Sequence, residues 1–373
     1  MVLHDLTDHL VCKRPKEEMK RVVVGMSGGV DSAVAAYLLK KEGYEVEGVM
    51  LRTWTSERGE QSRCCEIDDA RLIADAIDIP FHVRNCEDLF RNKICRPFTQ
   101  AYVNGRTPNP CIICNRCVKW EKMIEMADIL DAGLVATGHY AKVVITDDGR
   151  YTLKRADHIQ KDQTYMLYAL TQEMLRRTIM PLGGLSKDEV RRIAREASLP
   201  VAEKPDSQEI CFIPDDDHVR YIKENHNGPI PGEGNFVDEA GNILGRHAGI
   251  INYTVGQRKG LGIAFGHPMY VKRIDCASNE VVLAEDEALY VKNVRCSNVN
   301  FMGIEGIADD KEIRCFARIR YRHDPQSATA HMEGDELVVA FDDPVRAASP
   351  GQSAVLYDDE GCLIGGGIIE EGY

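Results

Sequence analysis

The stretch RVVVGMSGGVDSAVAAYLLKKEGYEVEGVML, which begins at Arg21, constrains the fold more than any other part of the chain. Residues 21–24 contain a β-branched run typical of a buried strand, residues 33–41 have helical periodicity that ends near Gly43, and residues 46–51 form a second apolar run. Two strands joined by a helix make a right-handed crossover with parallel strands. The sequence therefore predicts an α/β fold whose N-terminal domain is built on a parallel sheet.

The loop between that strand and that helix has the chemistry of an anion-binding site. It consists of Gly25, Met26, Ser27, Gly28, Gly29, Val30, Asp31 and Ser32. Glycines let the backbone approach a phosphate closely, and the N–H groups of the loop and of the helix N-terminus favour negative charge. The loop matches neither the Walker pattern, because no lysine follows the glycines, nor GxGxxG. Asp31 would repel phosphates unless a divalent cation intervened, so we expect Mg²⁺ to accompany the nucleotide.

The stretch GRTPNPCIICNRCVKW places Cys111, Cys114 and Cys117 at intervals of three. Asn109 is a typical helix N-cap and Pro110 suits the first helical position, so Cys111 is expected in the first turn of a helix. The partial positive charge at a helix N-terminus favours thiolate over thiol. These residues alone leave three interpretations open, which are a metal or iron–sulfur site, sulfur-transfer chemistry, and thiols that are merely buried.

Composition indicates a globular chain of two or three domains, with 373 residues, 44% hydrophobic and 28% charged. No run is apolar enough to span a membrane and the N-terminal segment does not resemble a signal peptide, so we expect a cytoplasmic protein without membrane contact. Most of the 13 cysteines, Cys64 and Cys65 included, are then expected to be packing or surface thiols. The net charge of −13 requires that any RNA contacts be gathered locally.

Changes in composition along the chain divide the sequence into three predicted domains, which are residues 1–213, 214–289 and 290–373. The second is rich in glycine and turn residues with short strand-like runs, which indicates a small β-rich module. The third has short alternating runs that predict a compact β-barrel. It also contains a basic stripe with an aromatic residue, of the kind that stacks nucleotides, formed by Arg318, Arg320, Tyr321 and Arg322.

Several stretches together resemble known enzymes. SGGVDS after a buried strand resembles the pyrophosphate loop of the N-type ATP pyrophosphatases, which cleave ATP between its α and β phosphates and adenylate a substrate oxygen. GRTPNPCIICN, VATGHYA, KDQTYML, KPDSQEICFI and YTVGQRKGLGI then follow in the order in which the tRNA-specific 2-thiouridylase family carries them. The resemblance implies ATP-dependent 2-thiolation of the wobble uridine in tRNAs for lysine, glutamate and glutamine. It also implies a sulfur donor, such as a cysteine desulfurase or a sulfur-relay protein.

The same resemblance implies roles for individual residues. Cys211 would carry a persulfide, Cys114 would be the second catalytic cysteine, which forms a disulfide with Cys211, and Leu51 and Gly138 would border the adenosine. Gly138 follows a short apolar strand, and ligands bind at the carboxyl ends of such strands in open α/β sheets. The implied tRNA contacts are Asn109, Pro110, Cys111, His139, Lys161, Asp162, Gln163, Arg320, Tyr321 and Gln352. From their chemistry alone, Asp162 and Gln163 could either read base edges or order their own loop.

Cys111 departs from the pattern, because many members of that family have an aspartate there, beside the target base. A general base at this position is therefore in doubt. Cys111, Cys114 and Cys211 supply three thiolates, enough for a [4Fe–4S] cluster with one open iron. Zinc would need a fourth ligand, for which Cys117 is the candidate, but no second CxxC separate from Cys111–Cys117 is present. Cys117 is therefore expected to face the core or to be a bystander. A persulfide relay is the main prediction, the cluster is the alternative, and an amidoligase acting on a small carboxylate is a more distant one.

Overall fold

The computed structural model describes residues 20–54, 66–205 and 210–373. Cys64, Cys65 and the DSQE of KPDSQEIC lie outside the described residues. The chain forms two compact units whose segments interleave along the sequence. The first unit contains the described residues up to Lys93 together with Cys111–Asp216 and Glu360–Leu363, and the second contains Ile94–Pro110, Asp217–Asp359 and Ile364–Tyr373.

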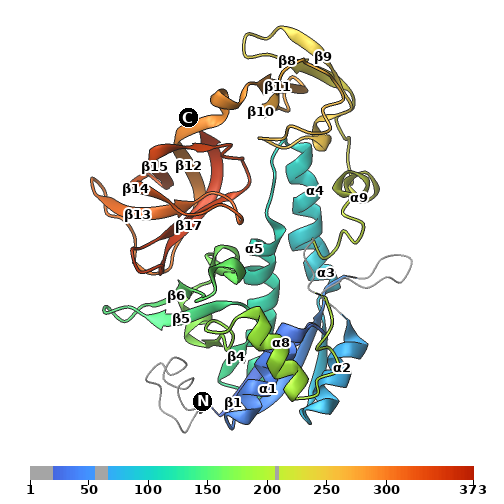
Figure 1. Cartoon of the computed structure of the whole chain (residues 1–373), viewed down its shortest axis with the longest axis vertical. Coiled ribbons are helices and arrows are strands. Elements are labelled where there is room, and N and C mark those ends of the chain that lie inside the picture. The colour runs from blue at the N-terminus through green and yellow to red at the C-terminus, as the bar shows by residue number, and fades with distance from the viewer. Residues whose placement is uncertain (1–19, 55–65, 206–209) are drawn as a thin grey trace. The chain divides into compact units, whose positions relative to one another are not determined.

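A five-stranded parallel sheet, in the order β3-β2-β1-β4-β7, is the centre of the first unit (Figure 1). Its strands are β1 (Arg21–Gly25), β2 (Glu45–Arg52), β3 (Phe81–Asn85), β4 (Leu134–Ala136) and β7 (Thr178–Ile179). Val22–Val24 are completely buried, as their β-branched run predicts. The α-helices that lie wholly in this unit are α1 (Val30–Lys41), α2 (Ile67–Ala76), α3 (Glu87–Phe90), α6 (Glu121–Ile129), α7 (Gln172–Arg176) and α8 (Lys187–Glu196). The predicted parallel α/β fold is confirmed.

Helix α1 follows β1 after a four-residue turn and ends where glycine permits it. Gly43 has φ +89°, the left-handed conformation that commonly terminates a helix, and the chain then enters β2. The buried face of α1 joins the sheet residues in one apolar core that also includes residues of α8. A hairpin of β5 (Ala141–Ile145) and β6 (Tyr151–Arg155) completes the unit's strands in the described residues.

The helix that carries the three closely spaced cysteines begins at Pro110, as predicted. It runs as α5 (Pro110–Cys114), a π-helical segment (Asn115–Trp120) and then α6. Trp120 is completely buried and its indole N–H donates to Thr178 Oγ1 at 2.8 Å. Because π-helical turns within α-helices are frequent at functional sites, the turn directly after Cys114 marks this segment for closer inspection.

The second unit begins with α4 (Arg96–Val103), which packs beside α9 (His218–Asn225) through Phe98 and Tyr221 (Figure 1). A four-stranded sheet in the order β10-β11-β8-β9 follows. Its strands are β8 (Gly234–Val237), β9 (Ile243–His247), β10 (Tyr270–Asp275) and β11 (Glu280–Ala284). This sheet has its own small core around Phe236 and Val271.

The C-terminal strands close into a barrel in the order β12-β15-β14-β13-β16-β17, which confirms the predicted β-barrel (Figure 1). They are β12 (Tyr290–Phe301), β13 (Glu312–Arg318), β14 (Gln326–Glu333), β15 (Glu336–Arg346), β16 (Ser353–Tyr357) and β17 (Leu363–Gly372). Closure leaves no exposed sheet edge, and alternate side chains fill the interior. Within the described ranges, no helix is long and apolar enough to cross a bilayer.

Candidate active site

The loop between β1 and α1 is organised by its own serines. Ser32 Oγ accepts a hydrogen bond from the Ser27 N–H at 3.2 Å and donates to the Gly29 carbonyl at 3.0 Å. Gly28 has φ +76°, which favours glycine. Gly29 is the N-cap of α1 and no side chain caps the helix, so the N–H groups of its first turn remain available for an anion. The loop therefore has the form of a phosphate-binding nest.

Gly138 lies against this loop. A Cβ atom at Gly138 would lie 2.7 Å from the backbone carbon of Asp31 and from the backbone nitrogen of Ser32. The predicted loop, Leu51 near the end of β2 and Gly138 just beyond β4 all lie at the carboxyl edge of the parallel sheet. This is the edge at which α/β folds bind nucleotides.

Asp31 is held by two groups that the sequence alone did not indicate. The Lys187 ammonium and the Tyr140 hydroxyl each donate to Asp31 Oδ1 at 2.7 Å. Lys187 is the first residue of α8 and its side chain is only 13% exposed. The expectation of Mg²⁺ depended on an uncompensated Asp31 charge, and Lys187 already offsets that charge. Repulsion from Asp31 is therefore not by itself a reason for a cation.

Lys204, the first residue of KPDSQEIC, reaches back to the same loop. Its ammonium donates to the Gly28 carbonyl at 3.0 Å and forms ion pairs with Glu66 and Asp69 at the start of α2. Burial alone would lower the pKa of Lys204, but its hydrogen bonds to Asp69 and Glu66 outweigh that effect and raise it. The signal that could have singled out Lys204 is its position, because it is a cation at the start of a motif that also contains Cys211, a candidate catalytic thiol.

The cysteines differ in accessibility. Cys111 is exposed, Cys114 is 8% exposed, and Cys117 and Cys211 are intermediate. Burial, followed by the charge of Glu121, raises the pKa of Cys117 in spite of nearby Arg116 and Lys93. Cys117 is therefore a poor candidate for a thiolate. This agrees with the expectation from the sequence that Cys117 has no catalytic role.

A cluster of three thiolates is not formed by the part of the chain that the structure describes. In that part, no three His, Cys, Asp or Glu side chains gather closely enough to hold a metal ion. As the described side chains stand, they do not fit a [4Fe–4S] cluster on Cys111, Cys114 and Cys211.

Asn115 ties the turn after Cys114 to the stretch KDQTYML. It is 2% exposed, and its side-chain amide donates to the Met166 carbonyl at 2.9 Å. In that stretch, Asp162 is also 2% exposed and accepts hydrogen bonds from the hydroxyl of Thr164 and the N–H of Ala156. Gln163 binds Tyr140 through its backbone and its side chain. Asp162 and Gln163 thus order their own loop, and Lys161 is the part-exposed cation beside them.

His139 packs against Trp120, with ring centroids 5.4 Å apart, and its Nδ1 lies 2.7 Å from Thr137 Oγ1. Burial, with a smaller contribution from the charge of Lys119, lowers the pKa of His139 to about 3. The ring is therefore neutral at physiological pH. It can offer one N–H to a ligand but no positive charge to a phosphate.

The basic stripe of the barrel is largely turned inward. Arg318 is 7% exposed, and its guanidinium lies over the Tyr321 ring, 5.5 Å from the ring centroid. Arg320 donates to the Val255 and Ala347 carbonyls, at 2.9 Å each. Arg322 is exposed. The structure thus uses Arg318 and Arg320 to hold the turn after β13, which leaves part-exposed Tyr321 and Arg322 as the accessible members.

Gln352 lies in the turn before β16, and its side-chain amide donates to the Thr107 carbonyl at 2.9 Å. Thr107 precedes Asn109 and Pro110, so Gln352 touches the segment that leads to the cysteines.

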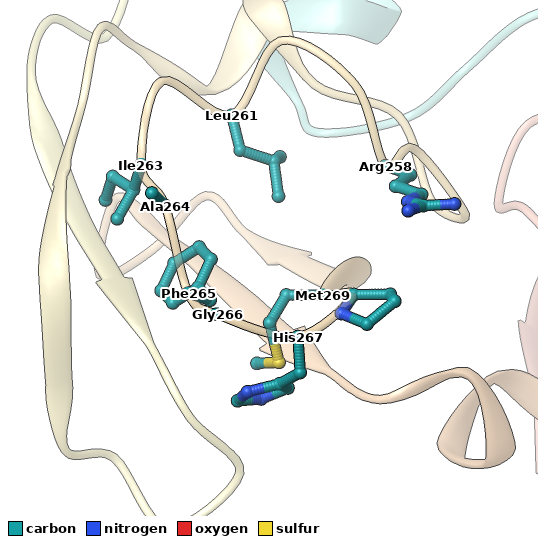
Figure 2. Close-up of a pocket in the computed structure, with 9 residues that line it drawn as sticks. Arg258, Leu261, Ile263, Ala264, Phe265, Gly266, His267 and Met269 are labelled. Carbon is teal, nitrogen blue, oxygen red and sulfur yellow. The ribbon is translucent and has the colours of Figure 1, made fainter.

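A pocket of about 340 Å³ lies in the second unit, within the loop that follows YTVGQ (Figure 2). Arg258 stands on the opposite side of the pocket from Ile263 and Phe265. None of the predicted site residues lines it. The candidate active site is therefore located by the phosphate loop and the thiols, and not by this cavity.

Comparison with known proteins assigns the chain to a family. Residues 20–215 match the model described as tRNA methyl transferase HUP domain, residues 222–285 its PRC-barrel domain, and residues 291–369 the aminomethyltransferase beta-barrel domain. The tRNA-specific 2-thiouridylase MnmA of Lachnoclostridium phytofermentans is 47% identical over 359 residues, which cover 94% of this chain and 99% of that protein. The chain belongs to the tRNA-specific 2-thiouridylase family.

A second relative agrees with this 2-thiouridylase assignment. MnmA 2 of Caldanaerobacter subterraneus subsp. tengcongensis is 48% identical over 364 residues, which cover 95% of this chain and 99% of the relative. Among solved structures, the U34-tRNA thiolase NcsA of Methanococcus maripaludis, with its [4Fe–4S] cluster, is 19% identical, with a TM-score of 0.37 over 60% of this chain and 72% of that one. The family is one of tRNA sulfurtransferases, so the predicted class of enzyme is confirmed.

Proposed function

We propose that this chain uses ATP to replace the C2 oxygen of the wobble uridine of tRNA with sulfur, through a persulfide on Cys211 and with Cys114 as the second catalytic cysteine. The observation that carries the proposal is that the main parts of the candidate site share one unit. The phosphate loop, Cys114 and Cys211 all belong to this one compact unit, in a chain that shares its full-length family with named 2-thiouridylases.

In the first step, ATP binds on the Gly25–Ser32 loop, with Leu51 and Gly138 beside the adenosine. The N–H groups at the start of α1 hold the phosphates, and Lys187 keeps Asp31 from repelling them. Mg²⁺, bound with the nucleotide, would neutralise further phosphate charge. The uridine C2 oxygen attacks the α phosphorus and pyrophosphate leaves, which converts a poor leaving group into AMP.

In the second step, the terminal sulfur of the Cys211 persulfide attacks C2, and the C2–O bond breaks to release AMP. The Cys114 thiolate then attacks Cys211 Sγ. That attack breaks the S–S bond, forms a Cys114–Cys211 disulfide and leaves the transferred sulfur on C2 as the thiocarbonyl. An external dithiol must reduce the disulfide before a second turnover.

The partners follow from this chemistry. The substrates are tRNAs for lysine, glutamate and glutamine, and the sulfur donor is a cysteine desulfurase or a sulfur-relay protein. We place the reaction in the cytoplasm, where thiols stay reduced between turnovers. Asn109, Pro110, Cys111, Lys161 and Tyr321 are the proposed tRNA contacts, together with a neutral His139.

The test compares wild type with Cys211→Ser and Cys114→Ser on unmodified tRNA. Both variants are expected to release pyrophosphate with tRNA present, because adenylation precedes sulfur transfer, and to form no 2-thiouridine. Arg192→Ala, on the exposed side of α8, is the control and should keep both activities. Thiolation by Cys211→Ser would contradict the relay, and a wild type that makes no AMP with any tRNA would contradict the proposed function.

A second measurement separates the relay from the cluster. Protein purified without oxygen is analysed for iron, acid-labile sulfide and the visible spectrum, in wild type and in Cys111→Ser. The relay predicts no stoichiometric iron and an active Cys111→Ser. About four irons per chain, lost in Cys111→Ser together with activity, would replace the persulfide scheme with a [4Fe–4S] cluster.

A further inference from the structure

The segment that precedes the cysteine helix is bound to the C-terminal barrel on both sides of one residue. The Thr107 N–H donates to the Pro350 carbonyl at 2.8 Å, and the Thr107 carbonyl accepts from the Gln352 side chain at 2.9 Å. Gly351 closes the turn with φ +93°, and a Cβ there would lie 2.9 Å from the Thr107 oxygen. Thr107 is therefore held on the turn formed by residues 349–352 through hydrogen bonds to both its main-chain N–H and its main-chain carbonyl.

The neighbouring residue strengthens the same attachment. Arg106 forms a bidentate pair with Glu370 on β17, at 2.5 and 3.0 Å, and also donates to the Ile369 carbonyl at 3.2 Å. Ser297 Oγ donates to Glu370 at 2.5 Å from β12. Burial raises the pKa of Glu370, but its hydrogen bonds from Arg106 and Ser297 outweigh this effect and hold the pKa below its ordinary value. The carboxylate is thus ionised when it holds Arg106.

The chain between Thr107 and the cysteine helix is short and stiff. Thr107 is followed by Pro108, Asn109 and Pro110, and the boundary between the two compact units falls directly after Pro110. Each proline fixes its own φ and pushes the residue before it out of the helical region, so this linker is stiff. Cys111 and Cys114 lie in the helix that starts at its end. A shift at Arg106 or Thr107 therefore moves the N-terminus of that helix.

We propose that Glu370 and the 349–352 turn of the barrel are positioning groups for sulfur transfer, because they fix the start of the helix that carries Cys111 and Cys114. This inference rests on the proposed function. It gives the barrel a part in the reaction that does not require contact with the substrate. A reacting group displaced by about 1 Å can lose roughly 100-fold in rate, so a modest loosening of this attachment is enough to be measured.

The Arg106–Glu370 pair is well suited to a test because its loss should leave the fold intact. The two side chains are 32% and 31% exposed, and part-exposed ion pairs contribute little to stability. The same barrel offers a matched control. Arg314 pairs with Asp342 through two hydrogen bonds at 2.9 and 2.7 Å, and neither residue is near the cysteine segment in the sequence.

The experiment uses the full-length protein preloaded with sulfur and measures three quantities for wild type, Glu370→Gln, Arg106→Lys and Asp342→Asn. These are the single-turnover rate of 2-thiouridine formation at saturating tRNA, the tRNA concentration that gives half-maximal rate, and tRNA-dependent pyrophosphate release. Glu370→Gln and Arg106→Lys are expected to lower the thiolation rate about tenfold or more, with the half-saturating concentration and the pyrophosphate release within about twofold of wild type. Asp342→Asn should match wild type in all three.

Two further measurements keep the test decisive. The exchanged pair Arg106→Glu with Glu370→Arg should recover part of the rate that either single change removes. Hydrogen exchange of the Thr107 amide should accelerate in Glu370→Gln and not in Asp342→Asn. Equal loss of thiolation in Asp342→Asn, or an unchanged rate in Glu370→Gln whose Thr107 amide exchanges faster, would overturn the inference. A wild type that forms no 2-thiouridine would instead overturn the proposed function.

Discussion

Lys187 Nζ lies 2.7 Å from Asp31 Oδ1, although 156 residues separate them in the sequence. We predict that Lys187→Met weakens ATP binding about tenfold to a hundredfold, because the uncompensated charge of Asp31 is then left to repel the phosphates. Calorimetric titration with a non-hydrolysable ATP analogue measures this change. Lys154→Met, which removes a more exposed ion pair with Glu360, is the control and should bind ATP as wild type does.

Gly138 gives a second prediction for the same loop. A methyl group at this position would lie 2.7 Å from backbone atoms of Asp31 and Ser32, and backbone cannot move aside as a flexible side chain can. Gly138→Ala is therefore expected to displace the phosphate loop, to cost about 1–3 kcal/mol in the free energy of unfolding and to abolish tRNA-dependent AMP release. Gly184→Ala, whose new methyl group would have an ordinary 3.5 Å contact, should keep stability and AMP release. Wild-type AMP release by Gly138→Ala would show that the loop tolerates the clash.

The strand–loop–helix at the N-terminus could be predicted because its information is local. The β-branched residues Val22–Val24, the glycines and the helical periodicity after them each act within a few residues, and the structure follows them closely. The closed barrel could be predicted in kind from its alternating runs. The start of the cysteine helix at Pro110 could likewise be predicted, because Asn109 and Pro110 are typical of a helix N-terminus.

The electrostatics of the site could not be predicted, because they depend on pairs that are distant in the sequence. Lys204 reaches Gly28 across 176 residues, and Gln352 reaches Thr107 across 245. No periodicity or spacing encodes such partners. Arg318 is a separate case: the basic stripe made it look like a solvent-facing cation, although its guanidinium is turned toward Tyr321, only three residues further along the chain. The sequence also offers no signal that residues 94–110 join the second unit.

The lowered pKa of the His139 imidazole should make stability depend on pH. Its pKa is about 3 in the folded protein, against about 6.5 in an unfolded chain, so between these values the unfolded state binds one more proton than the folded state. Stability is therefore lost as the pH falls through this window, by at most about 1.4 kcal/mol per pH unit from this one group. Urea unfolding of wild type and His139→Gln at pH 7, 6, 5 and 4 checks the sign, since the variant should lose less stability on acidification. Equal slopes in the two proteins would mean that His139 is protonated in the folded state.

The cysteines should react with an alkylating reagent in an order set by burial. Cys111 and Cys276 are exposed, whereas burial raises the pKa of Cys296 and Cys315 in the barrel core to about 12 each. Because the thiolate is the nucleophile, iodoacetamide at pH 8 is expected to modify the two exposed residues first and to leave the two core residues intact until the barrel unfolds. Mass spectrometry of tryptic peptides over time, with and without denaturant, measures this order. Early modification of Cys296 in the native protein would mean that the barrel opens readily, and an opening barrel could not hold Thr107 as firmly as the positioning proposal requires.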